Sequence, residues 1–226
     1  MTRGILIAGN ESSLFSAVAA EAVKRVEAYA FALIPNRFYI PDGAPPPPAE
    51  PTGKGVSLSW TPSSPISART LIVAAENRLG QINNAILVCS PPAVYRTAEA
   101  LTPEEIEILV NDHIRGWFFL IRELALNFRR LGTGSLSFIA PDLGSDSGAK
   151  NSQADLLGPP ALASFRTFTQ GILASSTNEP FQVMGFTAPE SGAKEEFAAW
   201  LFKIIDEGHR KNSGRWQKYP KIGFFR

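Results

Sequence analysis

Short apolar runs alternate along this chain with stretches whose apolar residues recur every three or four positions. A continuous apolar run is typical of a strand buried on both faces, and the wider spacing is typical of a helix packed on one face. Strands are predicted within 4–9, 28–35, 56–60, 83–92, 134–142, 180–190 and 215–225. Helices are predicted within 10–26, 64–80, 102–132, 159–176 and 193–208. This alternation predicts an α/β fold, a three-layer, doubly wound parallel sheet with helices on both faces.

The longest helix carries more apolar surface than one packed face needs. Thr102 and Glu105 form a capping box, and Gly132 ends the helix. One apolar stripe is predicted from Ile106, Val110, Ile114, Trp117, Ile121, Leu124 and Phe128. Phe118, Leu120 and Leu126 lie off that stripe, so the helix packs either against a helix of another subunit or in a wider groove of its own domain.

Two loops interrupt this pattern within what is predicted to be a single domain over residues 1–226. The proline-rich segment 41–55 is expected to be an exposed, partly extended loop, because proline density excludes helix and sheet interior. The second loop, 142–158, is polar and rich in glycine.

Composition excludes several classes of function. The net charge of +1 provides no field for nucleic acid or anionic lipid, and the basic residues after His209 are interpreted as a solvated surface. One cysteine, Cys89, excludes an internal disulfide and fits a reducing cytoplasm. With only His113 and His209 beside it, no ordinary zinc site is expected, and no metal is predicted. No signal peptide or membrane span is recognised, so a cytoplasmic protein is expected.

Several landmarks follow one another in a familiar order. A glycine turn stands at Gly9 and an arginine, Arg37, ends the second strand. The segments "ILVCSPP", "NDHIRG", "GSLSFIAP" and "VMGFTAPE" stand where one family has "LVNNAG", "VNLKG", "GSIVNISS" and "VNAIAPG". In this order and spacing the chain resembles the short-chain dehydrogenase/reductase (SDR) family over nearly its whole length. The resemblance implies a Rossmann-like fold and, in an ordinary member, an NAD(P) cofactor.

The first turn departs from the family pattern TGxxxGxG. Gly9 keeps the first glycine place, but Ser13 and Phe15 hold the other two, where glycines admit the pyrophosphate and close helix packing. Phe15 is expected either to enter the cofactor space or to push helix from strand. Trp60 either fills the adenine pocket or belongs to the core. No cofactor is therefore expected; if NAD(P) binds after all, the resemblance implies Gly9, Ser13 and Arg37 as contacts.

The family's catalytic groups are also replaced. The resemblance places Ala161 at the tyrosine, Phe165 at the lysine, Pro141 at the serine and His113 at the asparagine of the usual site. In the family the tyrosine donates a proton to the substrate carbonyl and the lysine lowers its pKa. No catalytic residue is expected here. A different chemistry is conceivable, with His113 as a base or Cys89 as a nucleophile, but a structural role is the alternative for each. Ligand contacts are conceivable from Tyr95, Asp142 and Lys150, and the alternative for them is ordinary loop polarity.

These replacements favour a catalytically silent SDR-like protein. It would be an oligomeric partner or non-catalytic subunit, associating through helices 104–131 and 159–176 with a second copy or an intact SDR subunit. Two alternatives stay open: an NAD(P)-dependent oxidoreductase with a non-standard site, and a small-metabolite-binding module on the same fold.

Overall fold

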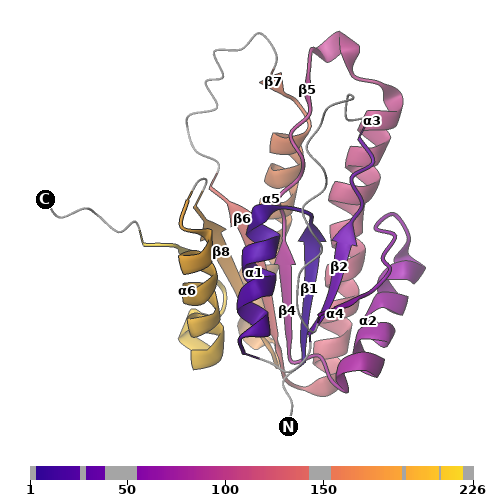
Figure 1. Cartoon of the computed structure of the whole chain (residues 1–226). Coiled ribbons are helices and arrows are strands. Elements are labelled where there is room, and N and C mark those ends of the chain that lie inside the picture. Colours follow the sequence, from indigo (N-terminus) through magenta and orange to yellow (C-terminus); the bar gives the residue numbers. More distant parts are fainter. Residues whose placement is uncertain are drawn as a thin grey trace, which may run out of the picture.

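The computed structural model describes residues 4–25, 29–38, 55–142, 154–189, 192–208 and 210–220. These residues form a single α/β domain around one seven-stranded parallel sheet (Figure 1). Its strands are β1 (Ile5–Asn10), β2 (Tyr29–Ile34), β3 (Gly55–Ser57), β4 (Asn84–Val88), β6 (Ser135–Pro141), β8 (Gln182–Ala188) and β9 (Arg215–Lys218). Their order in the sheet is β3-β2-β1-β4-β6-β8-β9, which confirms the predicted doubly wound topology.

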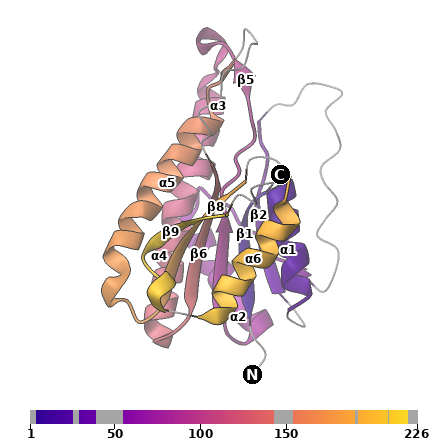
Figure 2. The ribbon, with the colours of Figure 1, turned by 90° about the vertical axis from the view of Figure 1, so that its left-hand side faces the viewer.

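Helices cover both faces of the sheet, as the side view in Figure 2 shows. One face carries α2 (Pro65–Leu79), α4 (Gly116–Leu131) and α5 (Gly158–Ser175), and the other carries α1 (Ser13–Val23) and α6 (Lys194–Glu207). Successive residues of a strand point to opposite faces. Leu6 therefore packs in the first layer and Ile7 in the second, and every residue of β1 is buried. This double burial explains the continuous apolar runs in the sequence.

The long helix contains a π-helical segment that the sequence analysis did not predict. It consists of α3 (Pro103–Ile108), η2 (Leu109–Arg115, π-helical) and α4, and the capping box of Thr102 and Glu105 and the left-handed cap at Gly132 are both present. The wider π turns change the phase of the helix. As a result, Ile106 and Val110, predicted on the core stripe, are exposed, whereas Ile108 and Leu109 are buried.

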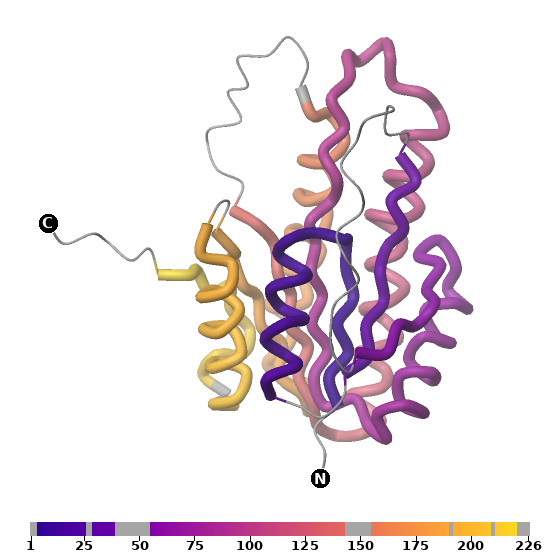
Figure 3. The backbone as a smooth tube through the Cα atoms, in the orientation of Figure 1, coloured from indigo at the N-terminus to yellow at the C-terminus, as the bar shows by residue number. Residues whose placement is uncertain are grey.

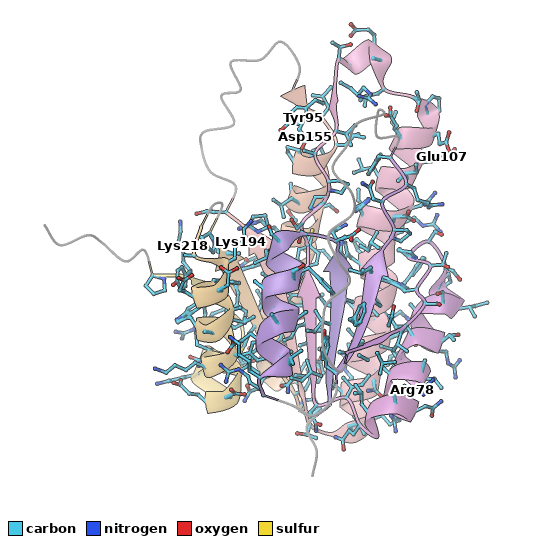
Figure 4. All side chains as sticks on the ribbon, viewed as in Figure 1. Arg78, Tyr95, Glu107, Asp155, Lys194 and Lys218 are labelled. Atoms are coloured by element: carbon cyan, nitrogen blue, oxygen red, sulfur yellow. The ribbon has the colours of Figure 1, made fainter. Side chains whose placement is uncertain are left out.

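A smaller antiparallel pair rises above the carboxyl ends of the parallel strands. β5 (Tyr95–Arg96) pairs with β7 (Ala154–Asp155), and the tube in Figure 3 shows β5 and the following short helix η1 (Ala98–Ala100) climbing away from the sheet towards α3. Tyr95 and Asp155 are register partners and lie side by side in Figure 4. Asp155 also accepts backbone hydrogen bonds from Val94 and Gly158, which joins this pair to the start of α5.

The start and the end of β3 differ from the prediction. Gly55, predicted in the proline-rich loop, begins β3, which ends before Trp60. Residues 41–54 and 143–153 of the two predicted loops lie outside the described residues, as do Lys150, His209 and the last part of the predicted terminal strand. The other short helices are η3 (Ser176–Asn178) and η4 (Arg210–Asn212). None of the described helices is long and apolar enough to cross a membrane.

Candidate functional site

The sheet topology indicates where a ligand would bind. From β1 the chain winds outward through β2 and β3, and from β4 it winds the other way through β6, β8 and β9. The carboxyl ends of β1 and β4 thus form the switch point at which open α/β sheets usually hold ligands. Around this point lie the first turn, the residues after β2 and β4, and the π-helical segment η2.

The first turn is closely packed. A Cβ atom at Gly9 would collide with the carbonyl oxygen of Val88 on β4, so only glycine fits between the two strands. Ser12 is the N-cap of α1, and its Oγ accepts a hydrogen bond from the backbone N–H of Phe15 at 3.1 Å. The hydroxyl of Ser13 accepts a hydrogen bond from Lys194 at the start of α6. Figure 4 places Lys194 at that end of α6, near Lys218.

The ring of Phe15 lies in the core. It is 1% exposed, packs edge-on to Phe31 with 6.5 Å between ring centroids, and belongs to the layer between the sheet and helices α1 and α6. Of the two predicted positions, the ring therefore takes the one between helix and sheet. The other alternative, a ring in the cofactor space, is contradicted, because the ring is buried in this apolar layer.

A polar bridge crosses the switch point. The side-chain oxygen of Asn10, at the end of β1, accepts a hydrogen bond from the backbone N–H of Ser90, which follows β4, at 3.0 Å. The side-chain amide of Asn10 lies 3.1 Å from Nδ1 of His113, to which it donates. Because Nδ1 accepts, the ring of His113 is neutral and carries its proton on Nε2. Asn10 and His113 are both buried.

His113 is held from its other side by an aromatic ring. Phe38 stacks on the imidazole with 5.5 Å between centroids and 18° between planes. Burial lowers the pKa of His113 to about 4; the carboxylate of Asp112 acts against this shift and the guanidinium of Arg37 adds to it. Nε2 has no hydrogen-bond partner among the described residues. A base with so low a pKa is unprotonated at neutral pH.

The guanidinium of Arg37 is already paired with a carboxylate of the same chain. Its Nε and Nη2 both donate to Oδ2 of Asp112, at 2.8 and 2.6 Å, and Asp112 is fully buried while Arg37 is half-exposed. A 2′-phosphate at Arg37 would compete with this carboxylate. Beside Arg37 is a cleft of about 490 Å³ lined by Arg37, Arg96, Ala100, Thr102, Glu104, Glu105 and Ile108.

The places of the usual catalytic tyrosine and lysine are occupied by core residues. Ala161 is completely buried, and Phe165 packs edge-on to Trp117 and Phe138, with centroids 5.0 and 6.0 Å apart. At the end of β6 the carbonyl of Pro141 accepts a hydrogen bond from Arg166, whose guanidinium lies 5.3 Å from the ring centre of Trp216. Of these residues only Arg166 is ionisable, and it is a poor proton donor.

The remaining candidates have structural surroundings. Cys89 is buried, and burial raises the pKa of its thiol, which disfavours the nucleophilic thiolate. Trp60 packs 5.7 Å from Trp117 within the core, so it is a core residue.

The described loop candidates are polar residues at the surface. Asp142 forms an ion pair with Lys218 at 2.8 Å. Tyr95 is exposed on β5. No group of three metal-ligating side chains occurs in the part of the chain that the structure describes.

Sequence reasoning missed Asn10, Phe38 and Asp112, which surround His113. A signal was present in the segment "NDHIRG", because two adjacent ionisable residues inside an apolar helix require buried partners. Asn10 gave no such signal, since a polar residue in a turn after a strand is ordinary.

Comparison with solved structures agrees with this architecture. An NADH-dependent reductase complexed with NAD superposes with a TM-score of 0.72 at 13% identity, covering 96% of this chain and 95% of that one. A short-chain dehydrogenase from Mycobacterium smegmatis gives 0.72 at 12% identity, with 98% and 93% covered. Levodione reductase gives 0.70 at 13% identity, with 96% and 95% covered. The fold is that of the short-chain dehydrogenases/reductases.

At these identities the structural likeness establishes the SDR fold alone. No protein-family model matches the sequence, and a search of curated protein sequences gives no match. Activity and cofactor must therefore be argued from the residues described above.

Proposed function

We propose that this chain is a catalytically silent member of the SDR family that acts as an oligomeric partner or non-catalytic subunit of an NAD(P)-dependent dehydrogenase. The observation that carries the proposal is the burial of Ala161 and Phe165 in the apolar core. The SDR reaction needs an acidic hydroxyl and a neighbouring cation at these places. A methyl group and a phenyl ring supply neither.

The residues at the first turn do not fit a dinucleotide held in the family's manner. Ser13 presents a side chain that already binds Lys194, and Phe15 fills the layer between α1 and the sheet. Arg37 directs two donors to Asp112, which leaves it a weaker anion contact. These features support the proposal that no cofactor is needed.

The association surface is proposed along α4 and α5. Phe118 and Leu126 are exposed on α4, and Phe118 stacks on Phe168 of α5 with 3.7 Å between centroids. A groove of about 200 Å³ lies beside them, lined by Ile121, Arg122, Ala125, Arg129, Phe168, Ile172, Ser175, Glu179, Phe181 and Val183. An exposed apolar groove on a folded domain is typical of an interface. We propose a second copy, or an intact SDR subunit, as the occupant.

The test compares the parent chain with Leu126→Glu by size-exclusion chromatography with light scattering. The parent is expected to form an oligomer, alone or with a co-expressed SDR carrying the YxxxK pair, and Leu126→Glu is expected to weaken it. Val73→Glu is the matched control, because Val73 is half-exposed on α2 and does not line the groove. A parent that stays monomeric and leaves the co-expressed enzyme's turnover unchanged would contradict the proposal.

Two alternative functions, an oxidoreductase and a metabolite-binding module, can be distinguished from the proposed one by simple measurements. Steady oxidation of NADH or NADPH by the purified chain with carbonyl substrates would indicate an oxidoreductase with a non-standard site. The cleft beside Arg37 and Arg96 favours, as a second candidate, binding of a small metabolite. Native mass spectrometry of freshly purified protein would reveal such a ligand. A cytoplasmic location is proposed for either candidate, and a single free cysteine, Cys89, is compatible with it.

A further inference from the structure

We propose that Asn10 and His113 form a built-in seal across the switch point, so that the chain's own side chains take the place that a nucleotide takes in other sheets of this topology. The inference rests on the proposed loss of cofactor chemistry. It does not depend on the association surface.

The first support is the position of Asn10. It is the last residue of β1, and its side-chain oxygen binds the backbone N–H of Ser90 just beyond β4. The two strands that border the switch point are therefore joined at their carboxyl ends by one side chain. Asn10 is 2% exposed, so solvent does not reach this connection.

The second support is the way His113 covers Asn10. The imidazole accepts a hydrogen bond from the Asn10 amide, stacks on Phe38 beyond β2 and is 1% exposed. His113 belongs to η2, whose π turns also direct the neighbouring Asp112 inward to Arg37. Groups from β1, from η2 and from the segments that follow β2 and β4 thus meet at the switch point.

The third support is the energetic balance of these groups. A buried asparagine side chain without hydrogen-bond partners is destabilising, so Asn10 depends on both Ser90 and His113. A dinucleotide lying across the carboxyl ends of β1 and β4, as in other sheets of this topology, would meet Asn10 and His113 there. The seal therefore opposes nucleotide entry while supplying the contacts that hold η2 on the sheet.

The test uses nuclear magnetic resonance of the histidine rings in the full chain. The chain has two histidines, so the variant His209→Gln assigns both sets of signals. His113 is expected to show the neutral ring protonated on Nε2, and its signals are expected to stay unchanged on addition of millimolar NADH or NADPH. A saturable shift of the His113 signals by either nucleotide would overturn the proposal.

A double-variant cycle provides the second measurement. Asn10→Ala, His113→Ala and the double variant are compared by urea unfolding. If the two side chains act as one seal, the double variant is expected to lose less stability than the sum of the single losses. Additive losses would show that the two groups act separately and would contradict the seal. If His113→Ala does not fold, His113→Leu, which fills the space without a hydrogen-bonding group, replaces it in the cycle.

The two proposals fail in different ways. A nucleotide-induced shift of the His113 signals would contradict the proposed seal but would not affect the measurements of oligomeric state. A monomeric chain with an unperturbed His113 would remove the association role and would leave the seal standing.

Discussion

The imidazole of His113 lies between the ring of Phe38 and the amide of Asn10, and this position determines how it titrates. In the unfolded chain a histidine has a pKa of about 6.5, and in the folded protein burial lowers the pKa of His113 to about 4. The folded state thus binds fewer protons than the unfolded state between these values. The contribution of the neutral His113 ring to stability is therefore fully present above about pH 6.5 and is lost as the pH falls towards 4.

We therefore expect His113 to lower the free energy of unfolding by about 3 kcal/mol as the pH is lowered from about 6.5 to about 4. Urea unfolding over this range measures the loss. The variant His113→Asn has no titrating ring, so the difference between it and the parent isolates His113 from the carboxylates. Parallel pH profiles of parent and variant would contradict the assigned environment.

The thiol of Cys89 gives a second prediction for a single residue. Because Cys89 is buried and its pKa is raised by burial, it is expected to react with a thiol-specific disulfide reagent only when the protein unfolds. The rate is measured with and without urea, and an added surface cysteine at Val73 serves as the reactive control. Fast reaction of the folded parent would reopen the nucleophile hypothesis for Cys89.

Among the elements, α3 depends most on its cap, since it has six residues before the π-helical segment begins. Thr102 accepts a hydrogen bond from the backbone N–H of Glu105 at 3.2 Å, and Glu105 accepts one from the backbone N–H of Thr102 at 3.0 Å. Glu105 also forms an ion pair with Arg96 of β5. The cap therefore joins α3 to the strand pair above the sheet.

Replacing Thr102 by alanine removes one half of the capping box. The expected loss is about 1 kcal/mol in the free energy of unfolding, measured with urea. Thr102→Ser keeps the hydroxyl and is expected to lose little. Equal losses in the two variants would assign the effect to the Thr102 methyl group instead of the cap.

The elements also show how far the sequence could be interpreted. The buried runs of β1, β4, β6 and β8 and the caps at Thr102 and Gly132 follow from local patterns, and the structure confirms them. The exposure of Ile106 and Val110 could not be predicted, because a π segment forms when buried side chains such as Asp112 and His113 find tertiary partners. The burial of the Phe15 ring likewise depends on Phe31, which lies far along the chain.

For the whole molecule, association and stability are linked. If the chain forms an oligomer through α4 and α5, binding adds to the stability of the folded state, and the unfolding midpoint rises with protein concentration. We expect such a rise for the parent and for Val73→Glu, and a smaller one for Leu126→Glu. Differential scanning fluorimetry over a hundredfold dilution series measures it. A midpoint independent of concentration in all three proteins would contradict association through this surface.

The two edge strands of the sheet, β3 and β9, also affect how the chain can associate. β3 has three residues, and β9 has four, of which Arg215 and Lys218 are exposed. Edge strands as short as these, one of them positively charged, offer another polypeptide little backbone to pair with, and this discourages fibril growth. Association through the proposed surface on α4 and α5 would therefore give a finite complex instead of an open-ended polymer.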